Sequence, residues 1–180
     1  MNRREFLLTL GAAGLAAAAP SVVFAQSRPI EQIRAEWKTF VAPGADIVLT
    51  PTPPQKLHNT EWKKRLQPAQ YNVLREEGTE RAGTSPLNDE KRRGVYACAG
   101  CGLALFTSDM KFDSGTGWPS FFTSIPGAFA TKRDFKLILP RTEYHCIRCE
   151  GHHGHLFTDG PKPTGERWCN NGVALRFVPT

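Results

Sequence analysis

Two Cys-x-x-Cys pairs constrain the fold of this chain more than any other feature of its sequence. Cys98 and Cys101, and then Cys146 and Cys149, have the spacing of paired zinc knuckles, in which both thiolates of a pair face one ion. Four thiolates complete a tetrahedral site and leave no position for a substrate, so the sequence predicts one structural Zn²⁺. The alternatives are two local disulfides or a redox pair, but a redox pair usually opens a helix after a strand, and neither pair here is followed by a helical pattern.

The fifth cysteine, Cys169, is left without a thiol partner in this scheme. It lies between Arg167 and Asn171, and in an extended strand Arg167 would share its face and lower its pKa. A single cysteine is more often a small buried hydrophobic residue than a nucleophile. The polar sequence around Cys169 nevertheless favours a reactive thiol.

Three of the five histidines follow the second cysteine pair. Each pair is preceded by a tyrosine and followed by a Leu-Phe dipeptide, but the second copy has a longer segment, residues 150–155, before that dipeptide. In this segment His152 and His155 are candidate proton donors or orienting groups, whereas His153 is expected to point elsewhere. The alternatives are that these histidines cap turns in a glycine-rich loop, or that they bind a metal whose four positions the thiolates already fill.

Residues 1–25 have the pattern of a twin-arginine signal peptide. Arg3 and Arg4 precede an apolar run over residues 6–19, and Val23 and Ala25 supply small residues for cleavage. The run has about 14 residues, whereas a membrane-spanning helix needs roughly 20. The sequence therefore predicts export by the twin-arginine route to the periplasm or another extracytoplasmic space, with no stable membrane association after cleavage. An uncleaved anchor is the alternative.

The remaining chain divides into an extension, residues 26–59, and a domain, residues 60–180. The extension combines an amphipathic helix over residues 28–40 with a proline-rich linker, and two short helices follow, one capped by Thr60 and one from Pro68 to about Gly78. From about Tyr96 short β-type runs alternate with glycine and proline, which predicts a mainly β fold of antiparallel strands with helices only at its start. The expected strands cover residues 94–97, 111–112, 135–139, 142–145, 156–157 and 173–178.

The charge distribution bears on possible partners. The net charge is +6, but lysines and arginines are scattered and form no stripe interleaved with aromatic residues. We therefore expect no nucleic-acid partner.

The order of these motifs resembles that of the methionine-R-sulfoxide reductases of the B type over roughly residues 60–180. The matching segments include both cysteine pairs and the histidine segment, together with residues 71–80, 111–115, 117–121, 141–143, 159–165 and 167–171. The resemblance implies two antiparallel sheets with short N-terminal helices and a paired zinc-knuckle subsite. It also implies a peptide-methionine (R)-S-oxide reductase that acts on oxidised proteins, with free methionine sulfoxide as a further candidate substrate.

The resemblance further implies roles for single residues. Cys169 matches the nucleophile, which attacks the sulfoxide sulfur and becomes a sulfenic acid while His152 or His155 supplies a proton. Arg167 and Asn171 match residues that support the thiolate and the histidine–water network. For substrate binding, Trp118 matches the aromatic wall around the S-methyl group, and Phe121 belongs to the same motif.

The chain departs from the family pattern at several positions. Thr116 stands where many members have a resolving cysteine, so an external thiol, such as that of a thioredoxin-like protein, or a sulfur from a partner must regenerate Cys169. The usual Tyr and Ser beside the nucleophile are Trp168 and Gly172, and a usual Leu is His153.

Two other classes of function remain open at this point. One is a zinc-knuckle binding module without catalysis, for which Cys169 would be dispensable. The other is a thiol oxidoreductase acting on disulfides, which the lack of a second redox cysteine disfavours.

Overall fold

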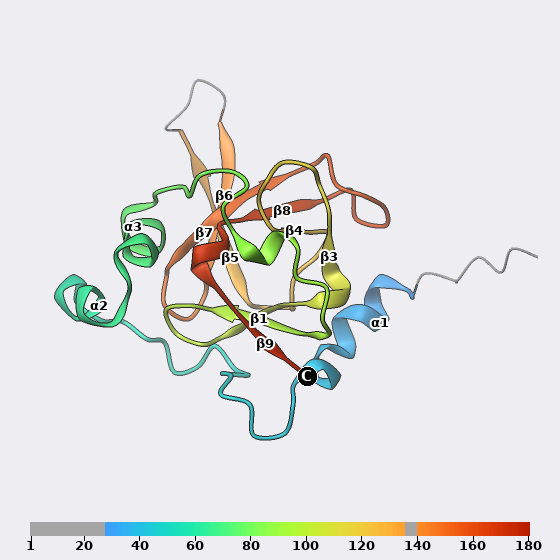
Figure 1. The fold of residues 1–180 in the computed structure, drawn as a ribbon, viewed down its shortest axis with the longest axis horizontal. Helices are drawn as coiled ribbons and strands as arrows, with labels where there is room; N and C mark the ends of the chain where they lie inside the picture. The colour runs from blue at the N-terminus through green and yellow to red at the C-terminus, as the bar shows by residue number, and fades with distance from the viewer. Residues whose placement is uncertain (1–27, 136–139) are drawn as a thin grey trace, which may run out of the picture.

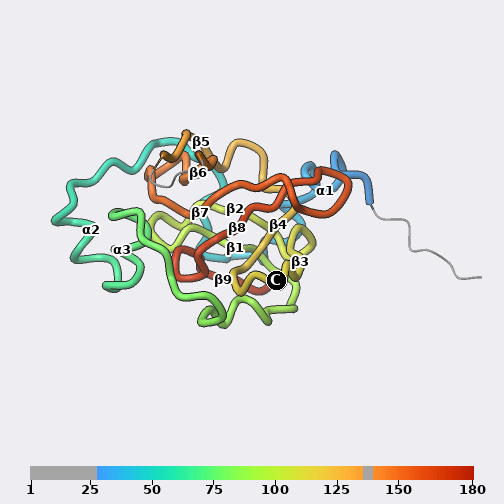
Figure 2. Tube along the Cα trace, turned by 90° about the horizontal axis from the view of Figure 1, so that it is seen from above, coloured from blue at the N-terminus to red at the C-terminus, as the bar shows by residue number. Residues whose placement is uncertain are grey.

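A computed structural model describes residues 28–135 and 140–180, and the predicted signal peptide over residues 1–25 lies outside this part of the chain. The described chain is mainly β, with two antiparallel sheets and its longer helices at the start, as predicted (Figure 1). The helix α1 lies on one side of the molecule and α2 and α3 lie on the other, a separation that Figure 2 shows from above. Within residues 28–135 and 140–180, no helix is long and apolar enough to cross a membrane.

Residues 28–135 and 140–180 form nine strands and seven short helices. The strands are β1 (Gly94–Cys98), β2 (Ala104–Thr107), β3 (Lys111–Phe112), β4 (Ser120–Phe121), β5 (Phe129–Asp134), β6 (Arg141–Cys146), β7 (His152–Phe157), β8 (Arg167–Asn170) and β9 (Leu175–Pro179). The α-helices are α1 (Ile30–Ala35), α2 (Asn59–Arg65) and α3 (Pro68–Glu76), and the 3-10 helices are η1 (Trp37–Phe40), η2 (Pro86–Asn88), η3 (Ser108–Met110) and η4 (Gly172–Ala174).

The core is an aromatic cluster between the two sheets. The smaller sheet has the order β2-β1-β9 and the larger one the order β3-β4-β8-β7-β6-β5. Phe106 of the smaller sheet stacks on Phe121 of the larger, with ring centroids 3.9 Å apart, and Tyr96 meets Phe121 edge-on at 5.0 Å. Trp168 of β8 packs from the larger sheet against Phe106. Such rings bury large apolar areas and hold β8 rigidly between β4 and β7.

The helices follow the sequence signals with small shifts. The predicted helix over residues 28–40 forms as α1 followed by η1, because the chain tightens into a 3-10 turn at Trp37. Helix α3 starts with Pro68 in its first turn, as expected, but Glu77 takes the left-handed C-cap conformation (φ 55°) one residue before Gly78. The cap of α2 is His58, whose side chain accepts from the Thr60 amide, and the predicted cap Thr60 lies inside the helix.

The strand expected over residues 135–139 lies outside the described part except for Phe135, which is exposed. The strand β5, which was not predicted, ends just before it at Asp134. Two other β predictions need correction. The histidine segment, expected as a loop, forms the first half of β7 because it pairs with β6 on one side and β8 on the other. The strand expected over residues 173–178 begins later, after η4.

The linker of the N-terminal extension contacts both cysteine pairs. The Val48 amide donates to the Gly102 carbonyl (2.9 Å), and the Val48 carbonyl accepts from the Ala104 amide (2.9 Å), beside the first pair. The Gln55 amide donates to the carbonyl of Arg148, within the second pair (2.7 Å). The linker therefore forms a strap, residues 48–55, that joins the two knuckles from outside.

Candidate active site and metal centre

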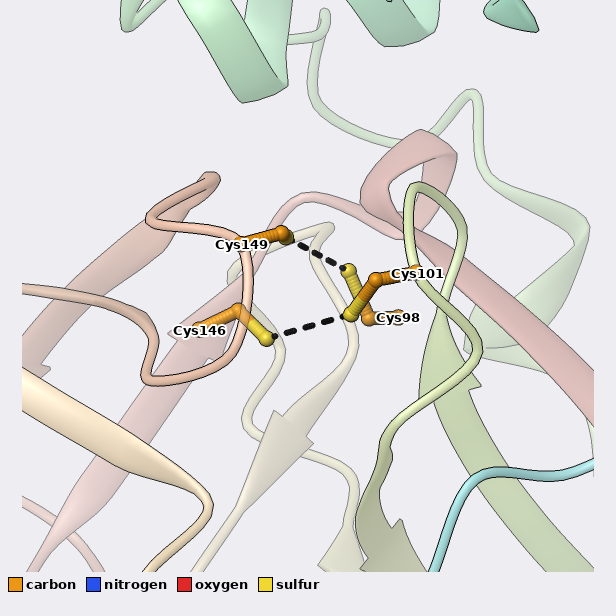
Figure 3. A group of neighbouring side chains, drawn as sticks. All are labelled: Cys98, Cys101, Cys146 and Cys149. Atoms are coloured by element: carbon orange, nitrogen blue, oxygen red, sulfur yellow. Dashed lines mark hydrogen bonds between the residues drawn. The ribbon is translucent and has the colours of Figure 1, made fainter. Parts of the chain in front are cut away.

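The four paired cysteines converge from two turns. Cys98 and Cys101 lie at the β1–β2 turn, Cys146 and Cys149 at the β6–β7 turn, and all four sulfur atoms lie within 4.8 Å of one another (Figure 3). Two sulfur contacts join the different turns: Cys98 to Cys149 at 3.6 Å and Cys101 to Cys146 at 3.5 Å. All four are free thiols in the structure, so the two local disulfides of the alternative interpretation are not formed here.

This cluster fits a tetrahedral metal. A zinc ion with Zn–S bonds of about 2.3 Å places its sulfur atoms about 3.8 Å apart, close to the separations found here. All four residues are buried, which leaves no open position for a substrate. Hydrogen bonds from the other three thiols, that of Cys146 first, lower the pKa of Cys101, whereas hydrogen bonds within the cluster raise the pKa values of Cys98 and Cys146.

One arginine ties the two turns together. Arg148, between the cysteines of the second pair, donates from Nη1 to the Cys101 carbonyl (2.9 Å) and to Gln55 Oε1 of the strap (2.8 Å). These bonds fix both turns at the spacing that the sulfur cluster requires.

The fifth cysteine lines a separate cavity of about 170 Å³ at the centre of the larger sheet. It is bounded by the strands β7 and β8, by the segment between α3 and η2, and by the segment that precedes β4. The lining residues are Thr79, Trp118, Arg141, Gly154, His155, Phe157, Cys169, Asn170 and Asn171. A cavity with a thiol, an imidazole, a guanidinium and aromatic walls can bind a small, partly apolar group and transfer protons to it.

Cys169 sits on β8 with its neighbours set by strand register. It lies opposite Ser120 of β4 and opposite His155 of β7. Burial raises the pKa of its thiol, and the charge of Arg167 and a hydrogen bond from Thr116 lower it by less. The predicted effect of Arg167 therefore has the expected direction, but the net pKa is raised because the thiol is more buried than the sequence suggested.

Arg167 is held in place beside this thiol. Its Nε and Nη2 donate to the two carboxylate oxygens of Asp159 (2.8 and 2.9 Å), and its guanidinium lies over the Phe157 ring at 4.2 Å. The bidentate pair raises the pKa of Arg167 and lowers that of Asp159. A permanent positive charge thus lies on the same face of β8 as Cys169.

His155 forms a hydrogen bond with a carboxylate at the rim of the cavity. Its Nε2 lies 2.7 Å from Asp134 Oδ2, and Arg141 Nη2 donates to the same oxygen, also at 2.7 Å. Burial lowers the pKa of His155, and the bond to Asp134 raises it by less. At neutral pH this imidazole is therefore mostly neutral, and its protonated form is a stronger acid than ordinary imidazolium.

His152 lies in a different cavity, although its ring is only 5.5 Å from that of His155. Its Nδ1 is 3.0 Å from Glu143 Oε1, and Lys132 pairs with the same carboxylate at 3.1 Å. Burial raises the pKa of Glu143, but His152 and Lys132 outweigh burial and lower it. His152, Glu143 and Lys132 line a polar cavity of about 350 Å³, so only His155 of the two candidate histidines lines the Cys169 cavity.

Trp118 and Asn171, both predicted site residues, line the Cys169 cavity and are anchored by Glu80. The indole of Trp118 donates to the Glu80 carbonyl (3.1 Å), and Asn171 Oδ1 accepts from the Glu80 amide (2.9 Å). Asn171 Nδ2 donates to the His153 carbonyl (2.9 Å). The Glu80 carboxylate accepts from the amides of Gly172 (2.5 Å) and Val173 (3.0 Å), which closes the segment after β8.

The remaining candidate residues lie in the core. Phe121 is fully buried under Phe106 and does not line the cavity. His153 is fully buried beside Phe129, and burial lowers its pKa to about 3. At Gly172, a Cβ atom would overlap the hydroxyl of Ser85, so Ser85 occupies the space beside this glycine.

Sequence reasoning missed the carboxylates that organise the site. Glu80, Glu143 and Asp159 fall within matched motifs but received no role, and Asp134 was not singled out. A bidentate partner for Arg167 could have been sought eight residues upstream at Asp159. Asp134 carries no local signal, because it reaches His155 only through the register of β5, β6 and β7.

Comparison with known proteins gives a consistent assignment. A family model described as the SelR domain matches residues 66–179. The peptide methionine sulfoxide reductase MsrB of Leifsonia xyli is 52% identical over 121 residues, covering 66% of this chain and 87% of the relative. The protein of the same name from Pseudomonas putida is 50% identical over 128 residues, covering 69% of this chain and 96% of the relative. The chain therefore belongs to the SelR-domain family of peptide methionine sulfoxide reductases, which are oxidoreductases.

Proposed function

We propose that this protein reduces methionine-R-sulfoxide in oxidised proteins, and free methionine sulfoxide as a second substrate, with Cys169 as the nucleophile. The observation that carries the proposal is the pairing of Cys169 with His155 across β8 and β7 inside a cavity walled by Trp118. The aromatic wall suits the substrate's S-methyl group, and the polar side suits its oxygen.

The chemical step has the net effect of moving one oxygen atom between two sulfur atoms. The Cys169 sulfur attacks the sulfoxide sulfur and forms an S–S bond, while the substrate's S–O bond breaks and its oxygen takes up two protons and leaves as water. Water then cleaves the S–S bond, and the products are methionine and a Cys169 sulfenic acid. The substrate sulfur is reduced by two electrons and the cysteine sulfur is oxidised by two, so no other electron donor takes part in this half of the cycle. Arg167 stabilises the thiolate form during the attack.

His155 is the better candidate for the proton donor to the sulfoxide oxygen. It lines the same cavity as Cys169, whereas His152 faces Glu143 and Lys132 in the neighbouring cavity. The lowered pKa of His155 makes its protonated form a strong donor. Asn171 holds the backbone of β7 and so keeps the adjacent strand in register.

The other four cysteines would hold one structural zinc ion. Their burial and their sulfur separations fit a closed four-thiolate site, and the ion would supply cross-linking of the two turns rather than chemistry. Because these thiols are occupied, Cys169 depends on an external thiol, such as that of a thioredoxin-like protein. Two thiols return the sulfenic acid to the thiol, with release of water and formation of one disulfide.

We also propose export by the twin-arginine route, on the basis of the sequence of residues 1–25. A fusion of these residues to a folded reporter should reach the periplasm. The same fusion with Arg3→Lys and Arg4→Lys should stay in the cytoplasm, and equal export of both would contradict this route.

The activity is tested with the two epimers of protein-bound methionine sulfoxide and dithiothreitol as reductant. The wild type should reduce the R epimer and leave the S epimer, and Cys169→Ser should be inactive while it unfolds at a similar temperature. Activity on neither epimer, or equal activity in Cys169→Ser, would defeat the proposal.

A further inference from the structure

We propose that Asp134 is a positioning residue for the reaction, which fixes the tautomer of His155 and sets its affinity for a proton. This inference rests on the proposed function, because it assigns a task to the residue that orients the proton donor. Asp134 lies at the end of β5, three strands away from Cys169, and it touches neither the thiol nor the substrate cavity.

The geometry places Asp134 in a line of side chains that crosses the larger sheet. Asp134 of β5 pairs with Arg141 of β6, and Glu143 of β6 pairs with His155 of β7. His155 in turn pairs with Cys169 of β8. The carboxylate is 6% exposed and the imidazole 12%, so water competes little with their 2.7 Å contact.

The contact determines which ring nitrogen carries hydrogen. A carboxylate only accepts hydrogen bonds, so the nitrogen that faces Asp134, Nε2, must carry the hydrogen. In neutral His155 the other nitrogen, Nδ1, is then the acceptor, and it is the ring nitrogen that does not contact Asp134. When Nδ1 takes up a proton it becomes the donor that serves the sulfoxide oxygen.

The contact with Asp134 raises the pKa of His155, whereas the other groups around the ring lower it. Burial, the positive charge of Arg141 and the neighbouring His152 all favour the neutral ring. Asp134 is the carboxylate in direct contact that favours the charged ring, while Glu143 is engaged with His152 and Lys132. Cys169, opposite His155, adds a negative charge only when it ionises.

Arg141 gives this arrangement a second constraint. It binds the same Asp134 oxygen as His155 and also lines the cavity. The guanidinium therefore opposes rotation of the carboxylate away from the imidazole. Asp134 and Arg141 together fix the orientation of the His155 ring.

The first test uses the resting wild-type protein and nuclear magnetic resonance of ¹⁵N-labelled histidine, so it needs no activity. We expect His155 in the tautomer with hydrogen on Nε2, assigned by comparison with His155→Gln. A predominant tautomer with hydrogen on Nδ1 would overturn the proposal.

The second test compares Asp134→Asn with Arg133→Gln, a matched change at an exposed neighbour on the same strand. Asp134→Asn keeps an acceptor oxygen but removes the charge, so the pKa of His155 should fall by about one unit, and Arg133→Gln should leave it unchanged. The limb of the kcat/KM profile that reports His155 should move to lower pH by the same amount. An unchanged pKa of His155 in Asp134→Asn would overturn the proposal. A wild-type protein that reduces neither epimer of methionine sulfoxide would count against the proposed function alone.

Discussion

The strongest structural prediction concerns Glu80, because one residue anchors both Trp118 and Asn171 and also closes the segment after Cys169. We consider Glu80→Gln, which keeps the size of the side chain but replaces one carboxylate oxygen with an amide nitrogen. That nitrogen cannot accept a hydrogen bond, so the amide of either Gly172 or Val173 loses its partner.

The magnitude follows from the kind of bond that is lost. A hydrogen bond to a charged acceptor contributes about 1.5–3 kcal/mol, so Glu80→Gln should lower the free energy of unfolding by about 2 kcal/mol. For a chain of this size that corresponds to a drop in Tm of roughly 4–8 °C. The substitution should also lower kcat/KM, because the Trp118 indole and the Asn171 side chain are both hydrogen-bonded to the Glu80 backbone.

The assay is urea unfolding followed by circular dichroism, with Glu61→Gln as the matched control. Glu61 pairs with Lys64 on the exposed face of α2, and such surface pairs contribute about 0.5 kcal/mol or less. If Glu80→Gln costs no more than Glu61→Gln, the role given to Glu80 is refuted.

Three further predictions concern other parts of the fold. His153 has a folded pKa of about 3, below its unfolded value of about 6.5, so the unfolded state takes up a proton first and stability falls as pH drops through 6.5. By pH 5 the contribution of His153 to this loss is about 2 kcal/mol, and His153→Leu should reduce the loss by that amount in urea titrations at pH 7.5 and 5. An equal loss in both proteins would contradict this. Arg148→Met removes the hydrogen bonds from Arg148 to the Cys101 carbonyl and to Gln55, and should speed zinc transfer to a chromogenic chelator about tenfold. Lys56→Met, at an exposed position, should not change this rate. Equal rates for the two variants would contradict the role of Arg148. Thr116→Cys should form an internal disulfide with Cys169 after one turnover, because Thr116 already hydrogen-bonds to this thiol, and mass spectrometry that finds only sulfenic acid would count against it.

The parts of the fold that depend on local spacing were predictable. The two-residue gaps within the cysteine pairs indicate a shared ion, and the four sulfur atoms do converge. Pro68 starts a helix for the local reason that a first turn does not need its amide. Arg167 shares a face with Cys169 because alternation along a strand is also local.

What escaped prediction depends on pairing between distant strands. β5 is missed because four of its six residues are polar and three are exposed, so the segment lacks the apolar alternation of a strand. Pairing with β6 holds it in place. The contact between Asp134 and His155 spans 21 residues and exists only in one register of three strands. The raised pKa of Cys169 likewise reflects burial by the surrounding sheet, which the charge of a neighbour in sequence does not report.

The most direct test of the account is a single turnover without reductant. The protein, free of other thiols, is mixed with excess methionine-R-sulfoxide, and both the methionine released and the modified residue are measured by mass spectrometry. We predict one methionine per chain and one added oxygen atom on Cys169, trapped as a dimedone adduct, with the four clustered cysteines unmodified. Methionine release without modification of Cys169, or oxidation that falls on Cys98, Cys101, Cys146 or Cys149 instead, would contradict it.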